Sequence, residues 1–266
     1  MRKDGEPLHG LTKKQIFEQA TIFRNQGNLY NLQNPYCEDA FRGSIDRFCE
    51  IAHRLRYSRR VLDVGAGNSI LASLLAELGH ECYALDVADL PALAPEIYRR
   101  GKIHFLQCNV EVDKLPFPDN FFNAVVCCQV LEHFTHSHLK IMNEIYRVLT
   151  IGGIVEVDVP NAVCFHNRSR IIRGKNITWD YERHYLDTNP IIYRGLSFYP
   201  DRHNREFTRN ELRLLLERGN FRNIDVYFLK SRRYRYGLER IKSFGSMLRD
   251  IIPSLRKSLI AFGEKV

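Results

Sequence analysis

Apolar and polar residues follow two different spacings along most of this chain. Short runs made largely of apolar residues predict buried strands at residues 59–67, 81–88, 102–110, 121–134 and 154–161. Stretches with apolar residues three and four positions apart predict helices between strands, at 68–80 and 137–153. Because continuous apolar strands that alternate with helices are typical of a parallel sheet covered on both faces, the pattern predicts an α/β fold.

The segments on either side of this region extend the same fold. Two helices are predicted before the first strand, at 11–27 and 37–57. A helix over 207–220 and strands over 221–229 and 258–266 are predicted after it, and Thr208 with Glu211 forms a capping-box pattern at the start of that helix. The complete prediction is a Rossmann-like, doubly wound, mostly parallel seven-stranded sheet with N-terminal helices and an insertion after the fifth strand.

This pattern divides the chain into four parts. Residues 1–58 form an N-terminal helical segment that we expect to act as a lid, with Arg24 and Tyr30 facing the site. Residues 59–161 form the core, and residues 207–266 complete the fold. Residues 162–206 interrupt the rhythm and are rich in Arg, Asn, His and Tyr. Since long insertions in compact domains are often functional, we expect this segment to select the substrate.

Composition places the chain among globular proteins, with 44% hydrophobic and 26% charged residues. No apolar run is long enough to cross a membrane, and the N-terminus lacks a signal-peptide pattern. The seven cysteines include no CxxC pair, which favours reduced thiols and a cytoplasmic location. No Cys/His spacing resembles a zinc ligand set, so the sequence predicts no metal site.

The net charge of +8 is concentrated near the C-terminus. Residues 230–266 hold ten Lys and Arg but only three acidic residues. Within them, 238–253 has the pattern of a basic amphipathic helix. Such a helix either packs its apolar stripe on the core or contacts an anionic partner, such as a membrane surface near a lipid-linked substrate or a nucleic acid.

Candidate chemistry begins at the first predicted strand, in the sequence VLDVGAGNS. Gly65 and Gly67 remove side chains where backbone would approach a ligand, and the following helix points free N–H groups toward it. Asp86 ends the second predicted strand, where an acidic side chain can bind ribose hydroxyls. Together they indicate a nucleoside site. Ile70 stands where a dinucleotide fingerprint has its third glycine, which argues against a NAD-dependent oxidoreductase.

Longer motifs resemble a known family. VLDVGAGNS, LDV, CNVEVDKLPFPDNFFNAVVCCQVLEHF and NEIYRVLTIGGIVEVDVPN are similar to the class I S-adenosylmethionine (SAM)-dependent methyltransferases, in particular the type 11 group. Asn109 and Asn123 depart from that pattern, because both replace an aspartate. The resemblance implies SAM as cofactor, bound by Asp63, Gly65, Ala66, Gly67, Asp86, Val87, Asn109, Val110 and Gln129.

Transfer of a methyl group to a hydroxyl requires a general base. His133 follows the fourth predicted strand and is the first candidate, because the ordinary pKa of histidine lies near neutrality. Glu132 and Asp158 are the other candidate catalytic residues, although Asp158 also suits a capping role. Candidate substrate residues in or near the insertion are Asn161, His166, Arg168, Tyr181, His184 and His203.

The resemblance and the insertion together favour O-methylation of a sugar, a glycan or another small-molecule hydroxyl. An RNA-directed methyltransferase using the basic C-terminal segment is one alternative, although no RNA-binding motif supports a nucleic-acid partner. A non-catalytic SAM-fold binding protein is another, and the intact glycine turn with Asp86 argues against it. The sequence leaves the acceptor and the oligomeric state open.

Overall fold

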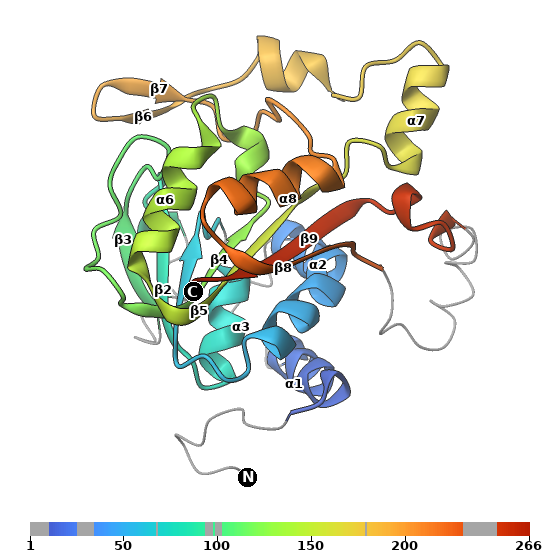
Figure 1. The fold of residues 1–266 in the computed structure, drawn as a ribbon. Coiled ribbons are helices and arrows are strands. Elements are labelled where there is room, and N and C mark those ends of the chain that lie inside the picture. The colour runs from blue at the N-terminus through green and yellow to red at the C-terminus, as the bar shows by residue number, and fades with distance from the viewer. Residues whose placement is uncertain are drawn as a thin grey trace.

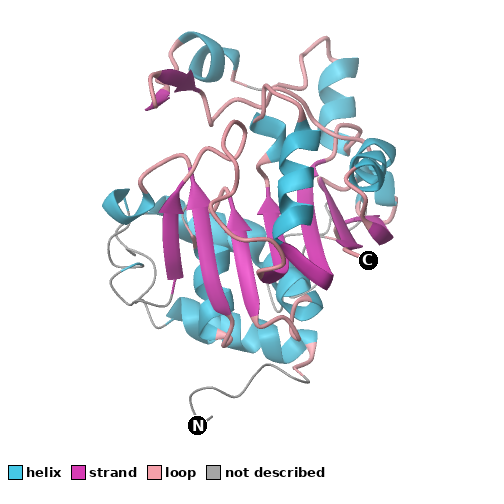
Figure 2. Cartoon of the chain, turned by 60° about the vertical axis from the view of Figure 1, so that its left-hand side comes forward, coloured by secondary structure: helices cyan, strands magenta, loops and turns pink. Residues whose placement is uncertain are grey.

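The structure is a computed structural model. It describes residues 11–25, 35–67, 69–93, 98, 103–178, 180–230 and 249–266, without the side chains of 23–25, 35–42 and 93. The described residues form an α/β domain, with a segment that lies across one end of its sheet (Figures 1 and 2).

The central sheet has seven strands in the order β3-β2-β1-β4-β5-β9-β8. Their bounds are β1 Arg60–Val64, β2 Glu81–Asp86, β3 Ile103–Gln107, β4 Phe122–Cys128, β5 Leu149–Pro160, β8 Arg222–Phe228 and β9 Ser258–Glu264. β1 to β5 pair in parallel, whereas β9 runs antiparallel to both β5 and β8. The predicted fold class, a mostly parallel seven-stranded sheet, is therefore confirmed.

Helices cover both faces of this sheet (Figure 1). One face carries α1 (Lys13–Asn25), α2 (Pro35–Arg54) and α3 (Ile70–Glu77). The other carries α6 (His138–Val148) and α8 (Arg209–Arg218). Side chains of successive strand residues point to opposite faces of the sheet: Val61 packs with the first group of helices and Leu62 with the second. This alternation explains why the strands appear in the sequence as continuous apolar runs.

The predicted helix at 207–220 forms as α8, with the predicted capping box. Thr208 Oγ1 accepts a hydrogen bond from the Glu211 backbone, and the Glu211 carboxylate accepts one from the Thr208 backbone. These reciprocal bonds satisfy N–H groups that a helix start leaves without partners. Phe207, just before the cap, joins Asn161 at the end of β5 in an isolated bridge, which returns the chain from the insertion to the sheet.

The insertion crosses the end of the sheet toward which the parallel strands point (Figure 2). It contains α7 (Phe165–Ile172), the short helix η2 (Glu182–Leu186) and a hairpin of β6 (Ile191–Tyr193) and β7 (Leu196–Phe198). The hydroxyl of Tyr193 donates to the Asp113 carboxylate, and Arg194 pairs with the same group at 3.1 Å. These bonds anchor the hairpin to the loop after β3, so the insertion spans the sheet from β5 to β3.

One predicted boundary is wrong. The sequence predicts a helix through residue 153, but α6 ends at Val148 and β5 begins at Leu149. Gly152 takes a φ of +75°, and Lys265 follows the last strand with reciprocal backbone bonds to Gly152 and Gly153. A tertiary contact more than a hundred residues away thus decides the local structure, which helical spacing alone did not reveal.

Several predictions concern residues outside the described part of the chain. They include Tyr30 and the Arg24 side chain of the lid, and most of the basic helix at 238–253. Contact of that helix with a membrane or nucleic acid therefore stays a prediction. Among the described helices, none combines the length and apolar character needed to cross a membrane.

Candidate active site

The turn after β1 lies beside β4, at the point where the strand order changes direction. The Gly65 and Ala66 N–H groups both donate to the Leu85 carbonyl, at 2.8 and 2.9 Å. Gly65 has a φ of +69°, and a Cβ there would lie 2.5 Å from Val130 Cγ2. Gly67 has a φ of +54° but faces open space. The first glycine therefore permits packing against the segment after β4, whereas the second leaves room for a ligand.

Asp86 ends β2 and holds the turn through its carboxylate. Its Oδ2 accepts a hydrogen bond from the Gly67 N–H and its Oδ1 accepts one from the Ala88 N–H, both at 2.9 Å. Burial raises the pKa of Asp86, while these backbone donors favour the charged form. Because each carboxylate oxygen can accept a second bond, Asp86 can still bind hydroxyl groups. The carbonyl of the neighbouring Val87 accepts from Gln107 Nε2 at 2.9 Å.

Asp63 lies one residue before the end of β1 and is 3% exposed. Burial, with a further contribution from the negative charge of Asp86, raises the pKa of Asp63 to about 7. The pKa of this carboxyl group therefore lies near neutral pH. A cation that binds next to the group stabilises its anionic form.

Asn109 follows β3 and is 5% exposed. Its Oδ1 accepts a hydrogen bond from the Glu111 N–H at 3.0 Å, which fixes the orientation of the amide. Its Nδ2 is buried and has no hydrogen-bond partner among the described residues. A buried amide donor without a partner is costly, so this atom is well suited to a ligand acceptor. Val110 packs in the core under the α6 face.

A buried polar cluster joins the ends of β4 and β5. Gln129, with a φ of +54°, donates from Nε2 to Asp158 Oδ1 at 2.7 Å. Arg47 of α2 donates from Nη1 to the same oxygen at 3.0 Å. Glu156 is also buried, and burial together with the charge of Asp158 raises its pKa well above the ordinary value. These contacts support the end of β5, and the catalytic role of Asp158 stays a prediction.

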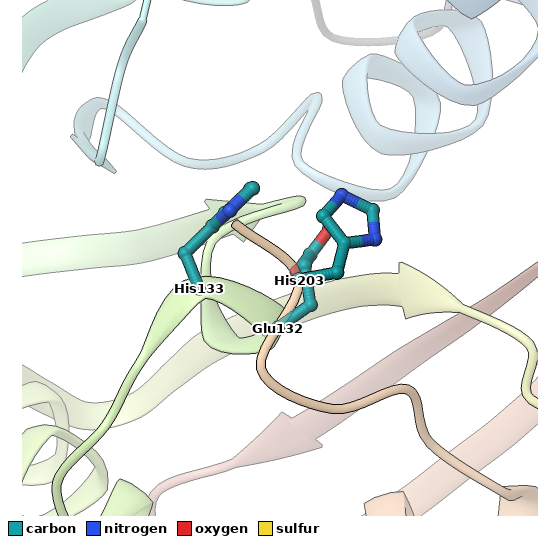
Figure 3. Close-up of side chains that lie close together, drawn as sticks. All are labelled: Glu132, His133 and His203. Carbon is teal, nitrogen blue, oxygen red and sulfur yellow. The ribbon is translucent and has the colours of Figure 1, made fainter. Parts of the chain in front are cut away.

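The short helix η1 (Leu131–His133) follows this cluster, and residues 202–205 of the insertion dock on it. His133 Nδ1 donates to the Arg202 carbonyl at 2.9 Å. Asn204 donates from its backbone to the Glu132 carbonyl at 2.7 Å and from Nδ2 to the His133 carbonyl at 2.6 Å. The docked segment places His203 beside both η1 residues (Figure 3).

Glu132, His133 and His203 each present a ligand atom within 4.8 Å of the other two. Glu132 is fully buried, and burial raises its pKa to about 8. Burial, followed by the charge of His203, lowers the pKa of His133 to about 4. The ring centroids of the two histidines are 4.9 Å apart. The structure therefore brings together two predicted catalytic residues and one predicted substrate residue.

A small cavity of about 60 Å³ adjoins these side chains, and the residues that line it are of polar types. It is lined by Thr178, His184, Asp201, His203 and Glu206. Two of the predicted substrate residues, His184 and His203, thus line one cavity.

The other four predicted substrate residues are not part of that lining. His166 and Tyr181 are exposed, and Arg168 donates to the Val163 carbonyl at 2.6 Å. Asn161 is fully buried and donates to two carbonyls of the segment before β9. Contact between these four residues and an acceptor stays a prediction.

Residues 62–157 match the family model described as a methyltransferase domain. A ubiquinone/menaquinone biosynthesis C-methyltransferase UbiE of Coxiella burnetii is 28% identical over 144 residues, which are 51% of this chain and 56% of that protein. The UbiE of Escherichia fergusonii is 24% identical over 79% of this chain and 85% of its own length. The first relative is therefore matched over little more than half its length.

Solved structures agree on the fold. A SAM-dependent methyltransferase of Thermotoga maritima, described as a possible histamine N-methyltransferase, has a TM-score of 0.56 at 16% identity, covering 95% of this chain and 99% of that one. A Burkholderia thailandensis 1,6-didemethyltoxoflavin-N1-methyltransferase with bound S-adenosylhomocysteine has a TM-score of 0.53 at 16% identity, covering 96% and 91%. Residues 62–157 therefore match a methyltransferase domain, and the chain has the fold of SAM-dependent methyltransferases.

The first turn and the end of β2 fit the predicted SAM site in two respects. Gly67 leaves open space where backbone would approach the cofactor, and Asp86 keeps acceptor capacity for ribose hydroxyls. The unpaired Asn109 Nδ2 fits a ring nitrogen of adenine, and Asp63 fits the cationic amino group of the methionine part. The individual contacts of these residues with SAM stay predictions.

Two residues of the candidate site were not predicted from the sequence. Arg47 lies in a predicted helix, but nothing in the spacing indicates that it reaches β5, 111 residues away. Glu206 lines the cavity and accepts a hydrogen bond from Asn167 Nδ2. The sequence feature that could have indicated Glu206 was its position directly before Phe207, which forms a β-bridge with Asn161 at the end of β5.

Proposed function

We propose that this protein is a SAM-dependent methyltransferase that methylates a hydroxyl group of a sugar or a similar small polyhydroxylated molecule. The observation that carries the proposal is the polar cavity beside η1, lined by Thr178, His184, Asp201, His203 and Glu206. Carboxylates, imidazoles and a hydroxyl are groups that bind the many hydroxyls of a sugar. Among the described residues, the lining includes no Phe, Tyr, Leu, Ile or Val side chain.

The charges of the cavity lining, which includes two carboxylates and no arginine among the described residues, narrow the proposal to an acceptor without negative charge. Arg202 lies with its guanidinium carbon 3.7 Å from the centre of the Tyr199 ring and donates to the His184 carbonyl at 2.8 Å. Arg168 is occupied by the Val163 carbonyl. The cavity itself has two carboxylates, Asp201 and Glu206, and would repel a phosphate.

The segment from Cys128 to His133 connects the predicted SAM site to the cavity. Bound SAM supplies a methyl group that its sulfonium has already activated for transfer. Val130 borders the glycine turn, and Glu132 and His133 lie beside His203, which lines the cavity. In this proposal, an acceptor hydroxyl in the cavity is directed toward the bound cofactor. Orientation of that hydroxyl supplies much of the rate enhancement.

His133 was predicted as the general base. Its Nδ1 donates to the Arg202 carbonyl, so the neutral ring presents a free lone pair on Nε2. Glu132 and Asp158 remain the other predicted catalytic residues. Which group receives the hydroxyl proton is part of this proposal and is tested by the variants below.

Carbon methylation of a quinone precursor is the competing function, because UbiE relatives carry that name. A quinone ring is flat and largely apolar, and it would gain little from walls made of carboxylates and imidazoles. The cavity lining therefore favours the polyhydroxylated acceptor.

The test is transfer of a radiolabelled methyl group from SAM to two acceptor panels. One panel contains simple glycosides and nucleotide-free sugars, and the other contains hydroquinones with short isoprenoid tails. We expect labelled methyl ethers from the first panel only, with transfer lost in His133→Ala. The exposed Glu77, at the opposite end of α3, supplies the control variant Glu77→Gln. Carbon-methylated products from the second panel alone would overturn the proposal.

A further inference from the structure

We propose that Glu132, His133 and His203 form a binding site for one divalent transition-metal ion. The three side chains come from two segments, η1 and the docked residues 202–205, and lie close together in Figure 3. Their ligand atoms all lie within 4.8 Å of one another, a separation that a single ion can bridge.

The carboxylate of Glu132 supplies independent support for an ion. The residue has no exposed surface, and neither carboxylate oxygen accepts a hydrogen bond from another residue in the described part of the chain. Burying a carboxyl group without partners is costly, and proteins normally pair such groups or use them to coordinate metals. The nearby Arg47 directs its two Nη atoms to Asp158 and Ser44 instead.

The orientation of His133 is that of a metal ligand. Its Nδ1–H donates to the Arg202 carbonyl at 2.9 Å, which leaves the lone pair of Nε2 for coordination. Metal-binding histidines commonly have their second nitrogen held by a carbonyl or carboxylate in this way. His203 Nδ1 lies 4.0 Å from Glu206 Oε1, which is too long for a hydrogen bond but places a negative charge near this ring.

The donor set indicates the class of ion. Two imidazole nitrogens and one carboxylate suit Zn²⁺, Mn²⁺, Fe²⁺ or Co²⁺, whereas Mg²⁺ and Ca²⁺ favour oxygen ligands. Three protein ligands leave coordination positions for water or substrate. The sequence predicts no metal site because these ligands do not form a recognisable spacing: two are adjacent and the third follows 70 residues later in the chain.

The ion would also activate the acceptor, a role that rests on the proposed hydroxyl methylation. The cavity shares His203 with the three-residue cluster, so a hydroxyl bound in it can reach an open coordination position. Coordination makes a hydroxyl more acidic. Its proton leaves to solvent, and the oxygen forms the new O–CH3 bond as the S–CH3 bond of the cofactor breaks. His133 then serves as a ligand and not as the base.

The site is tested by calorimetric titration of the full chain, first dialysed against a chelator, with Zn²⁺, Mn²⁺ and Mg²⁺ separately. We expect one Zn²⁺ or Mn²⁺ ion per chain, bound at least about 10-fold more weakly by Glu132→Gln and by His203→Ala. Glu132→Gln preserves the shape of the buried side chain, so we expect the variant protein to keep the wild-type fold. His104→Ala is the matched control, since His104 is an exposed histidine of β3.

Equal Zn²⁺ and Mn²⁺ binding by the wild type and both variants would overturn the site, as would absence of one-to-one binding. This titration needs neither SAM nor an acceptor, so its failure is distinct from failure of the proposed function. If sugars are methylated equally with and without chelator, hydroxyl methylation stands and the activating ion is disproved.

Discussion

Arg47 and Asp158 meet across 111 residues of sequence, with Arg47 Nη1 3.0 Å from Asp158 Oδ1. Asp158 has no exposed surface and the Arg47 side chain is 15% exposed. This buried pair connects α2 to the end of β5, next to the residues proposed to act on the acceptor. The position of α2 against the end of β5 therefore depends on an ion pair as well as on apolar packing.

Replacement of Arg47 by Met should destabilise the protein by about 3–5 kcal/mol, because it leaves the Asp158 carboxylate buried without its cation. Lys14→Met removes an exposed lysine that lies 3.9 Å from Glu18 and should cost about 0.5 kcal/mol or less. Urea unfolding of both variants provides the comparison. Similar losses in the two variants would mean that the buried pair does not hold α2 in place.

The two glycines of the first turn should respond differently to a methyl group. In Gly65→Ala, the new Cβ meets Val130 Cγ2 at 2.5 Å, so we expect a loss of about 2–4 kcal/mol in unfolding free energy from backbone strain and overpacking. In Gly67→Ala, only backbone strain of about 1–2 kcal/mol is expected, but the methyl group enters the space left for SAM.

Unfolding and SAM titration separate these two effects. Gly67→Ala should bind SAM at least about 10-fold more weakly, an effect of about 1.4 kcal/mol. Val130→Ala should recover part of the stability lost in Gly65→Ala, since it removes the clashing methyl groups. No recovery in that double variant would show that the close approach to β4 is not what requires Gly65.

The surroundings of Asp63 should make both the unfolding free energy and SAM affinity depend on pH. Burial raises the pKa of this carboxyl group to about 7, and the charges of Asp86 on β2 and Asp158 on β5 act in the same direction. A backbone hydrogen bond from Ala72 on α3 and the charge of Arg47 on α2 oppose the shift. The folded state therefore holds the proton of Asp63 more tightly than the unfolded state does.

Stability that Asp63 contributes in acid should be lost as the pH rises through about 7, because the folded protein must then accept a buried charge. Asp63→Asn should flatten the fall in unfolding free energy between about pH 5 and pH 8. An unchanged slope in this variant would contradict the assignment. SAM affinity should rise over the same range, with proton release that calorimetry in buffers of different ionisation enthalpy detects.

Most of the fold was predictable because its signals are local. Apolar runs marked the strands, and Thr208 with Glu211 marked the start of α8. The glycine turn and Asp86 were predictable for the same reason, since both lie at strand ends. The start of β5 was not predictable, because the pairing of Leu149 with Phe122 of β4 and the backbone bonds of Lys265 to Gly152 and Gly153 override helical spacing there.

The acceptor side of the site could be predicted only in part. His133 and Glu132 were found because they directly follow a strand. The approach of His203 to them depends on backbone hydrogen bonds between Asn204 and η1, which no residue spacing reveals. Arg47 was not predicted as a site residue, because a polar residue in an amphipathic helix ordinarily faces solvent.

The central claim is that SAM binds at the carboxyl ends of β1 and β2, with Asp86 as a principal contact. Calorimetric titration of the wild type, Asp86→Asn and the control Glu77→Gln with SAM tests it most directly. We predict micromolar binding by the wild type and Glu77→Gln, and at least about 10-fold weaker binding by Asp86→Asn with its fold intact. Absence of SAM binding by the wild type, or equal binding by all three proteins, would contradict the account.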